Sequence, residues 1–147
     1  MADSVCTITT YKGPRGSTVD QRTQTVRGTL AFSAGHYPAG TGVAGTTGWA
    51  LNWSNVEAVK ALPTPPTTGP SSTGSPAPFD CDIKSIASPP SGVVYLWDSV
   101  SGNVHMYVVA NASSNSSGPL EEYGGTVIPQ YIINDIVEFR AVFERNG

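Results

Sequence analysis

Hydrophobic and polar residues alternate most clearly close to the C-terminal end of the chain. The apolar residues of this segment share one face of an extended strand: Val137, Phe139, Ala141 and Phe143. The charged residues share the other face: Glu138, Arg140 and Glu144. A period of two is typical of a strand with one buried and one wet face. We therefore predict a core strand over residues 136–144.

The same alternation, in weaker forms, marks further strands. Residues 25–32 place their larger apolar side chains on one face: Val26, Leu30 and Phe32, together with Gly28. Residues 49–53 do so with Trp49, Leu51 and Trp53, and residues 83–86 fit a short strand. Residues 5–11 alternate only weakly. We predict strands over 25–32, 49–53 and 83–86.

Residues 93–109 have the pattern of a β-hairpin. Two apolar segments, 93–97 and 104–109, flank a turn that contains Asp98 and the pair Gly102-Asn103. The first of these strands is apolar on both faces, with Val93, Tyr95 and Trp97 on one and Val94 and Leu96 on the other. Such a strand lies between layers or beneath a partner.

Two central segments are harder to assign. Val56, Val59 and Leu62 fit a helical stripe, but the segment is too short for periodicity to decide, and we favour a strand over residues 56–62. Residues 63–78 consist almost entirely of Pro, Thr, Ser and Gly. Proline has no amide proton for a strand ladder, so we expect a long exposed loop there.

These elements predict an all-β fold with short antiparallel strands arranged as a sandwich over residues 25–147. Residues 1–24 are mostly polar, contain a turn-rich break at residues 12–16, and include Arg15 and Arg22. We interpret them as an extended N-terminal arm that contacts a neighbouring molecule and not the core of its own chain.

The composition of the chain argues against some classes of function. The 147 residues include only 8 Lys and Arg against 11 Asp and Glu, so the chain lacks the basic surface of a nucleic-acid binder. Charged residues make up 13%, below the roughly 25% of ordinary soluble domains. A low content of charged residues is expected either for a monomer with a polar, uncharged surface or for a protein whose surface is partly covered by neighbours.

The sequence contains no sign of membrane insertion or export. No apolar run approaches the roughly 18 residues of a membrane span, and the first residues lack a basic and apolar signal pattern. We therefore expect synthesis in a cytoplasm. There Cys6 and Cys81 are expected to be reduced thiols, with a single bridge as the alternative.

The residues that usually carry chemistry form no catalytic or metal-binding motif. The nucleophile motif Gly-x-Ser-x-Gly and the phosphate-binding loop are both absent. His36 and His105 lack metal-ligand spacing, and the sequence from Asp80 to Asp82 has too few oxygen ligands for calcium. We interpret Glu121 and its neighbour Glu122 as a solvated pair. We predict no catalytic residue, metal or cofactor, and hence a protein that is not an enzyme.

The three tryptophans have two interpretations. Trp49, Trp53 and Trp97 could form a platform on which sugar rings stack. Alternation of Trp with Leu along a strand is more typical of a core, and we favour that interpretation.

Four stretches resemble small virion structural proteins of tailed bacteriophages, in particular head decoration (capsid cement) proteins. The stretches are Gly28-Thr-Leu-Ala-Phe-Ser-Ala-Gly-His-Tyr-Pro-Ala-Gly40, Gly92-Val-Val-Tyr-Leu-Trp-Asp98, Ser101-Gly-Asn-Val-His-Met-Tyr107 and Asp135-Ile-Val-Glu-Phe-Arg-Ala-Val-Phe143. The resemblance covers the chain from Gly28 onward, apart from the middle loop over residues 63–78.

This resemblance implies a jelly-roll-like sandwich on the outside of a phage capsid, commonly as a homotrimer at a three-fold position. It implies the major capsid protein as partner, with no nucleic acid and no membrane, and it supplies no catalytic residues. The expected function is to bind the outer capsid surface and stabilise the head. The alternative is a receptor- or carbohydrate-binding sandwich of a tail or fibre. The expected capsid or subunit contacts are Tyr11, Arg15, Arg22, Tyr95, Trp97 and Tyr107.

Overall fold

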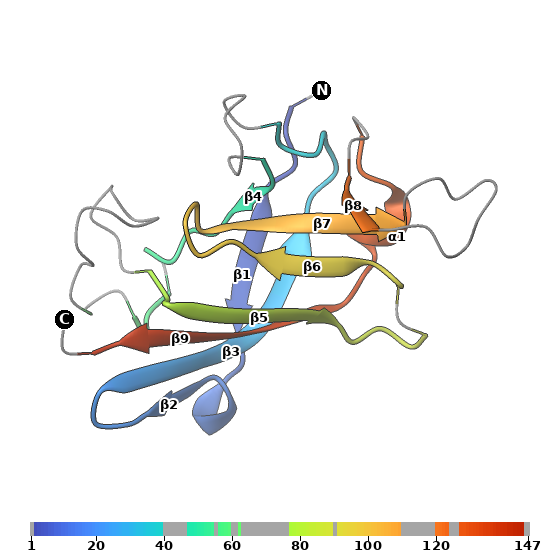
Figure 1. Ribbon diagram of the computed structural model, residues 1–147. Helices are drawn as coiled ribbons and strands as arrows, with labels where there is room; N and C mark the ends of the chain where they lie inside the picture. Colours follow the sequence, from blue (N-terminus) through green and yellow to red (C-terminus); the bar gives the residue numbers. More distant parts are fainter. Residues whose placement is uncertain are drawn as a thin grey trace.

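The protein is all-β, as predicted, and two antiparallel sheets account for its strands (Figure 1). The computed structural model describes residues 2–39, 47–54, 56–59, 62, 77–89, 91–109, 120–123 and 127–145. Within these ranges, helical structure is limited to the 3-10 turn η1 (Gly13–Arg15) and the single-turn helix α1 (Gln130–Ile133).

The first sheet is built around the two strands with the strongest alternation. Its strands are β1 (Cys6–Thr10), β2 (Ser17–Val19), β3 (Thr23–Phe32), β5 (Asp80–Ser85) and β9 (Val137–Glu144). Their order is β1-β3-β9-β5, with β2 pairing with β3 beside β1. Every second residue of β9 is buried from Val137 to Phe143, so the predicted register of the C-terminal strand is confirmed.

The segment that we expected to form an arm contributes two strands to this sheet. β1 pairs with β3 from Cys6 opposite Phe32 to Thr10 opposite Gly28, and β2 pairs with the preceding part of β3. Cys6 is buried, and Ser4 before it is buried as well. Residues 6–19 therefore lie within their own domain, because the free edge of β3 offers backbone partners that compensate for their weak hydrophobicity.

The second sheet contains the predicted hairpin. Its strands are β4 (Trp49–Ala50), β6 (Val94–Trp97), β7 (Asn103–Val109) and β8 (Leu120–Glu122). β7 pairs with β6 along one edge and with β4 and β8 along the other. The turn closes where the amide of Gly102, which has a φ of 76°, donates to the carbonyl of Asp98 at 2.7 Å.

The expected strand over residues 56–62 is wrong for the described part of that segment. Successive amide-to-carbonyl bonds join Val56 to Trp53, Val59 to Val56, and Leu62 to Val59. This three-residue spacing belongs to consecutive tight turns, and it directs Val56 and Val59 into the core. Of the predicted loop over residues 63–78, only Ala77 and Pro78 lie in the described part, and Pro78 is buried.

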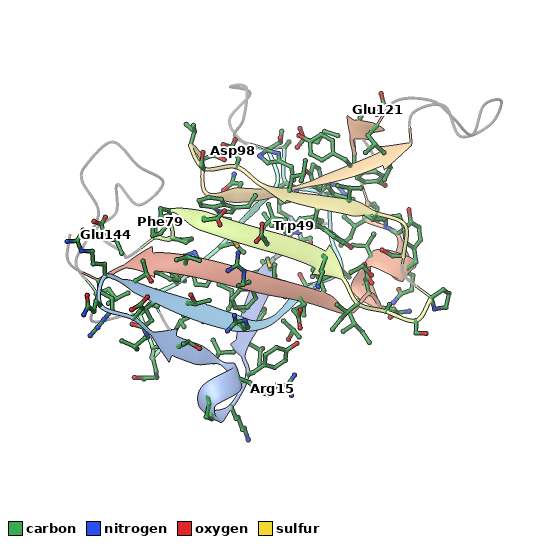
Figure 2. All side chains as sticks on the ribbon, turned by 60° about the horizontal axis from the view of Figure 1, so that its bottom comes forward. Arg15, Trp49, Phe79, Asp98, Glu121 and Glu144 are labelled. Atoms are coloured by element: carbon green, nitrogen blue, oxygen red, sulfur yellow. The ribbon has the colours of Figure 1, made fainter. Side chains whose placement is uncertain are left out.

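The core lies between the two sheets and is rich in aromatic rings. Trp49 packs against Phe32, with ring centroids 4.1 Å apart and the ring planes tilted by 32°, and Figure 2 shows Trp49 in the interior. Trp53 packs edge-on against Phe139 and Phe143. Gly28 lies directly opposite Phe139, and a Cβ atom at Gly28 would lie 2.9 Å from the Phe139 ring and against the Thr9 carbonyl. Glycine in the middle of β3 therefore makes room for this ring.

The edge strands β5 and β6 bring the two sheets side by side (Figure 1). A carboxylate joins them at one end: Asp135 accepts from the Ser85 hydroxyl at 2.6 Å and from the Tyr95 hydroxyl at 2.8 Å. The two sheets are thus tied together both through the core and through this shared acceptor.

Candidate interaction surfaces

The outer side of the second sheet carries exposed apolar side chains. In the hairpin, Val94 lies opposite Tyr107 on this side, whereas Tyr95 and its partner Met106 point into the core. Leu96 is 53% exposed and Leu120 of β8 is 50% exposed. We call Val94, Leu96, Tyr107 and Leu120 the hairpin face. The first hairpin strand thus places Tyr95 on the inner side and Leu96 on the outer side, where Leu96 lies opposite His105 of the second strand.

A shallow hollow continues this apolar surface toward the first sheet. It has a volume of about 370 Å³ and lies between β5 and β6, where Ile83, Val93 and Val94 contribute to its lining. The apolar surface therefore extends across the junction of the two sheets.

Of the three expected contact residues of the hairpin, two lie on the inner side of the sheet and one on the outer side. Tyr95 is 2% exposed and is part of the core of its own chain. Trp97 lies opposite Val104 on the inner side and is half-buried, and its indole nitrogen has no hydrogen-bond partner. Only Tyr107 of these three belongs to the hairpin face.

Two of the three expected contacts near the N-terminus lie together. The Tyr11 hydroxyl donates to Glu138 at 2.8 Å, and the Arg15 guanidinium lies 4.7 Å from the centre of the Tyr11 ring. Arg22 is exposed in the turn between β2 and β3, where its carbonyl accepts from the Arg145 amide. Tyr11 and Arg15 thus form a small unit on the outer side of the first sheet.

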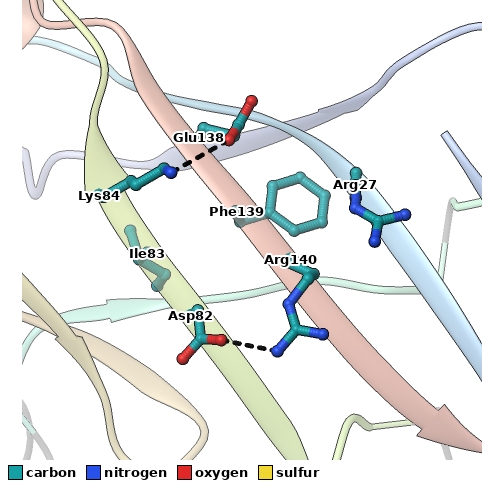
Figure 3. Close-up of a pocket in the computed structure, with 7 residues that line it drawn as sticks. All are labelled: Arg27, Asp82, Ile83, Lys84, Glu138, Phe139 and Arg140. Carbon is teal, nitrogen blue, oxygen red and sulfur yellow. Dashed lines mark hydrogen bonds and ion pairs between the residues drawn. The ribbon is translucent and has the colours of Figure 1, made fainter. Parts of the chain in front are cut away.

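The outer side of the first sheet also carries a groove lined by charged residues (Figure 3). It has a volume of about 300 Å³, and we call it the charged groove; its lining is Arg27, Asp82, Ile83, Lys84, Glu138, Phe139 and Arg140. Arg140 lies 2.9 Å from Asp82, and Lys84 lies 3.9 Å from Glu138. Sequence analysis missed this groove, because its side chains come from three strands.

The charged groove also explains why an aspartate lies on each side of Cys81 in the sequence. Asp80 and Asp82 point outward to Arg140, and Cys81 between them points into the core. The arginine thus takes the position that a cation would occupy. Cys81 and Cys6 are both free, and burial is the main cause that raises the pKa of each thiol to about 12.

A buried histidine connects three segments of the second sheet. Nδ1 of His105 lies 2.7 Å from a Glu122 carboxylate oxygen, which also accepts from the hydroxyls of Tyr37 and Thr47. Nε2 lies 3.5 Å from Asp98 in the hairpin turn. Glu122 is therefore not part of a solvated pair, whereas Glu121 is exposed.

The geometry around His105 favours a structural role. An ionised carboxylate only accepts hydrogen bonds, so Nδ1 carries the proton that is donated to Glu122. In a nucleophilic triad the other nitrogen faces a hydroxyl or thiol, but here Nε2 faces the carboxylate of Asp98. Among the described residues, no group of three or more His, Cys, Asp or Glu side chains is arranged to hold a metal ion.

This cluster leads to a prediction about acid stability. Burial alone would raise the pKa of Glu122, but hydrogen bonds from Thr47, His105 and Tyr37 outweigh it and hold the pKa below the ordinary 4.5. Because the pKa of Glu122 is lower in the folded protein than in the unfolded chain, the unfolded chain takes up a proton first as the pH falls. The stabilisation by this carboxylate is therefore lost below about pH 4.5.

The substitution Glu122→Gln removes this titrating group. The free energy of unfolding in urea, measured between about pH 3 and pH 6, should then depend less steeply on pH than in the wild type. The exposed neighbour provides the control: Glu121→Gln should follow the wild type, and an equal flattening there would contradict the assignment.

The tryptophans that could have formed a sugar platform lie mostly in the core. Trp49 is 1% exposed and Trp53 is 4% exposed, which confirms the core interpretation for both. Neither ring offers a face to a ligand in solution.

Comparison with known proteins places the chain in no family: no protein-family model, no curated protein and no solved structure matches it. In the described part of the chain, no helix has the length and apolar character needed to cross a membrane.

Proposed function

We propose that this protein is a non-enzymatic phage virion structural protein that binds the outer capsid surface and stabilises the head. The observation that supports it best is the hairpin face, where Leu96 and Leu120 are each about half exposed beside half-buried Val94 and Tyr107. Contiguous exposed apolar side chains mark interaction sites on soluble proteins. The sequence resemblance to capsid decoration proteins assigns the partners.

In this proposal the hairpin face forms a subunit interface of a homotrimer, and the trimer binds the major capsid protein. A standard interface buries roughly 800 Å² on each partner, and the proposal places the hairpin face and its adjoining hollow inside such an interface. A protein that binds only the assembled lattice stabilises it by mass action. The jelly-roll-like strand connection, the three-fold position and the location on the capsid exterior belong to the same proposal.

The alternative, a carbohydrate-binding sandwich, loses its main support in the structure. It needs an aromatic platform in a groove, but Trp49 and Trp53 are buried. The charged groove is lined by one aromatic residue, Phe139, whose side chain is itself buried. We therefore retain the capsid-binding proposal.

The mass of the oligomer in solution tests whether the hairpin face is a subunit interface. Leu96→Asp should weaken self-association at least about tenfold, because the interface would then hold a desolvated charge without a partner. Val100→Asp is the matched control, since Val100 is 81% exposed in the turn of the same hairpin and outside the hairpin face. Light scattering over a concentration series measures both.

The virion provides the second measurement. Quantitative mass spectrometry of purified particles should find this chain in hundreds of copies, as a multiple of three. A wild-type protein that is monomeric both in solution and on the particle would contradict the trimer. Absence from purified particles would contradict the virion function.

A further inference from the structure

One arginine of the charged groove has no charged partner among the described residues. Arg27 of β3 lies directly opposite Arg140 of β9, so two like charges face each other across neighbouring strands. Arg140 is compensated by Asp82 and more distantly by Asp80. Arg27 forms no ion pair with any residue that the structure describes. Like charges at directly opposed positions destabilise a sheet, and in this pair the neighbouring carboxylates compensate Arg140 alone.

The carboxylates near Arg27 already have other partners. Glu138 lies 3.9 Å from the Lys84 ammonium and accepts from the Tyr11 hydroxyl. Asp82 is hydrogen-bonded to Arg140 at 2.9 Å. Figure 3 shows Lys84 directed toward Glu138 and Arg140 toward Asp82, with Arg27 on the far side of Arg140. Arg27, a half-buried residue, therefore keeps its guanidinium donors available to a ligand in the groove.

The charge of the groove defines the ligand. Its lining holds three cations, Arg27, Lys84 and Arg140, and two carboxylates, Asp82 and Glu138. Among the lining residues one positive charge is thus unmatched; Asp80, which lies outside the lining, is 4.0 Å from Arg140 and not paired with Arg27. A single carboxylate balances the unmatched charge, and a guanidinium binds a carboxylate with two parallel hydrogen bonds. The two carboxylates of the lining disfavour a polyanion of high charge density such as a nucleic acid.

We propose that Arg27, supported by Arg140, is the docking point for an acidic side chain of a protein partner, held in the charged groove. This inference deepens the proposed function, on which it rests for the identity of the partner as a capsid subunit. The groove lies on the outer side of the first sheet and the hairpin face on the outer side of the second. One surface can therefore bind the capsid while the other joins copies of this chain.

The binding chemistry can be measured on the isolated full chain, independently of any capsid. The probe is a tetraglutamate peptide blocked at both ends, titrated into isotope-labelled protein while the arginine side-chain NMR signals are recorded. We expect saturable shifts at Arg27 and Arg140. Arg27→Gln should weaken binding by about tenfold or more, as expected for the loss of a charge-assisted hydrogen-bonded pair. Arg27→Lys should weaken binding less, because it keeps the charge but loses the two parallel bonds.

Matched controls separate this site from general charge attraction. Lys12→Gln removes an exposed cation outside the groove and should leave the affinity unchanged. A tetraglutamine peptide should not bind. Thermal unfolding of each variant verifies that it is folded. Arg27→Gln should not destabilise the protein, because it removes a like-charge contact with Arg140, and Arg27→Lys should unfold close to the wild type, because it keeps the charge.

The outcomes are decisive in both directions. Equal binding by wild type and Arg27→Gln, or no saturable binding by tetraglutamate, would overturn the inference. Binding of inorganic phosphate at Arg27 more tightly than the peptide would replace the acidic side chain by a phosphate ligand and would also overturn it. Failure of the trimer test at Leu96, with peptide binding intact, would refute the proposed assembly and leave this acid-binding site standing.

Discussion

Replacing Phe139 with alanine should lower the free energy of unfolding by roughly 3–5 kcal/mol, the usual cost of truncating a fully buried aromatic side chain. Phe139 is 0% exposed, and its ring packs edge-on against Trp53 with centroids 5.5 Å apart. Gly28 opposite has no side chain that could move into the space. The substitution would therefore leave a cavity between β9 and the strand beside it, which urea unfolding at equilibrium would detect as a lower midpoint.

The adjacent residue provides the control for this prediction. Glu138 lies on the outer side of β9, where it accepts from Tyr11 and pairs with Lys84, whose side chain is 73% exposed. Exposed pairs of this kind contribute up to about 1 kcal/mol, so Glu138→Ala should cost no more than that. Equal losses of stability in the two variants would contradict the register of β9.

The strands that could be predicted from sequence are those with one face in the core. Val137 and Phe143 mark the buried face of β9, and Val26 and Leu30 mark that of β3, because each inward residue had to be apolar. The hairpin was predictable for a different reason: Asp98 and Gly102 provide the turn chemistry between two apolar segments.

Elements that are held mainly by backbone hydrogen bonds, with few buried apolar side chains, could not be predicted in the same way. β1 lies at the edge of its sheet, and its outward side chains Thr7 and Thr9 are exposed, so its alternation is weak. Backbone hydrogen bonds along β3 hold it, and these leave no trace in the residue types. The three-residue turns that bury Val56 and Val59 were mistaken for a strand because so short an apolar segment fits several periods.

The candidate sites depend on which residues face each other across neighbouring strands, and this register cannot be read from the sequence. Arg140 was correctly placed on the wet face of its strand, but its position opposite Arg27 follows only from the pairing of β9 with β3. Sequence analysis assigned no partner to His105, because its partners come from a turn and another strand: Asp98 lies in the hairpin turn and Glu122 in β8. The hairpin turn and the pairing of β7 with β8 bring these residues together.

Deletion of residues 2–10 should leave a chain that does not fold cooperatively. The deletion removes β1, which pairs with β3 at five positions, and uncovers the edge of β3 near Phe32. It also removes Ser4, whose hydroxyl accepts from the Trp49 indole at 3.0 Å and donates to the carbonyl of Ser33. Each lost hydrogen bond is worth about 1 kcal/mol, and the buried Cys6 contact is lost with them. Such losses are comparable with the whole stability of a domain, about 5–15 kcal/mol.

A full-length chain with Thr7 and Thr9 both changed to alanine is the matched control. Both side chains are exposed, so this variant keeps the backbone pairing of β1 and should unfold cooperatively at a midpoint close to that of the wild type. Near-ultraviolet circular dichroism during urea unfolding distinguishes the two variants through their buried tryptophans. A truncated chain with a native spectrum and a sharp transition would show that the N-terminal residues are a dispensable arm. Loss of that transition in the truncated chain alone would show instead that the sheet needs β1 to close the edge of β3, although few of its residues are apolar.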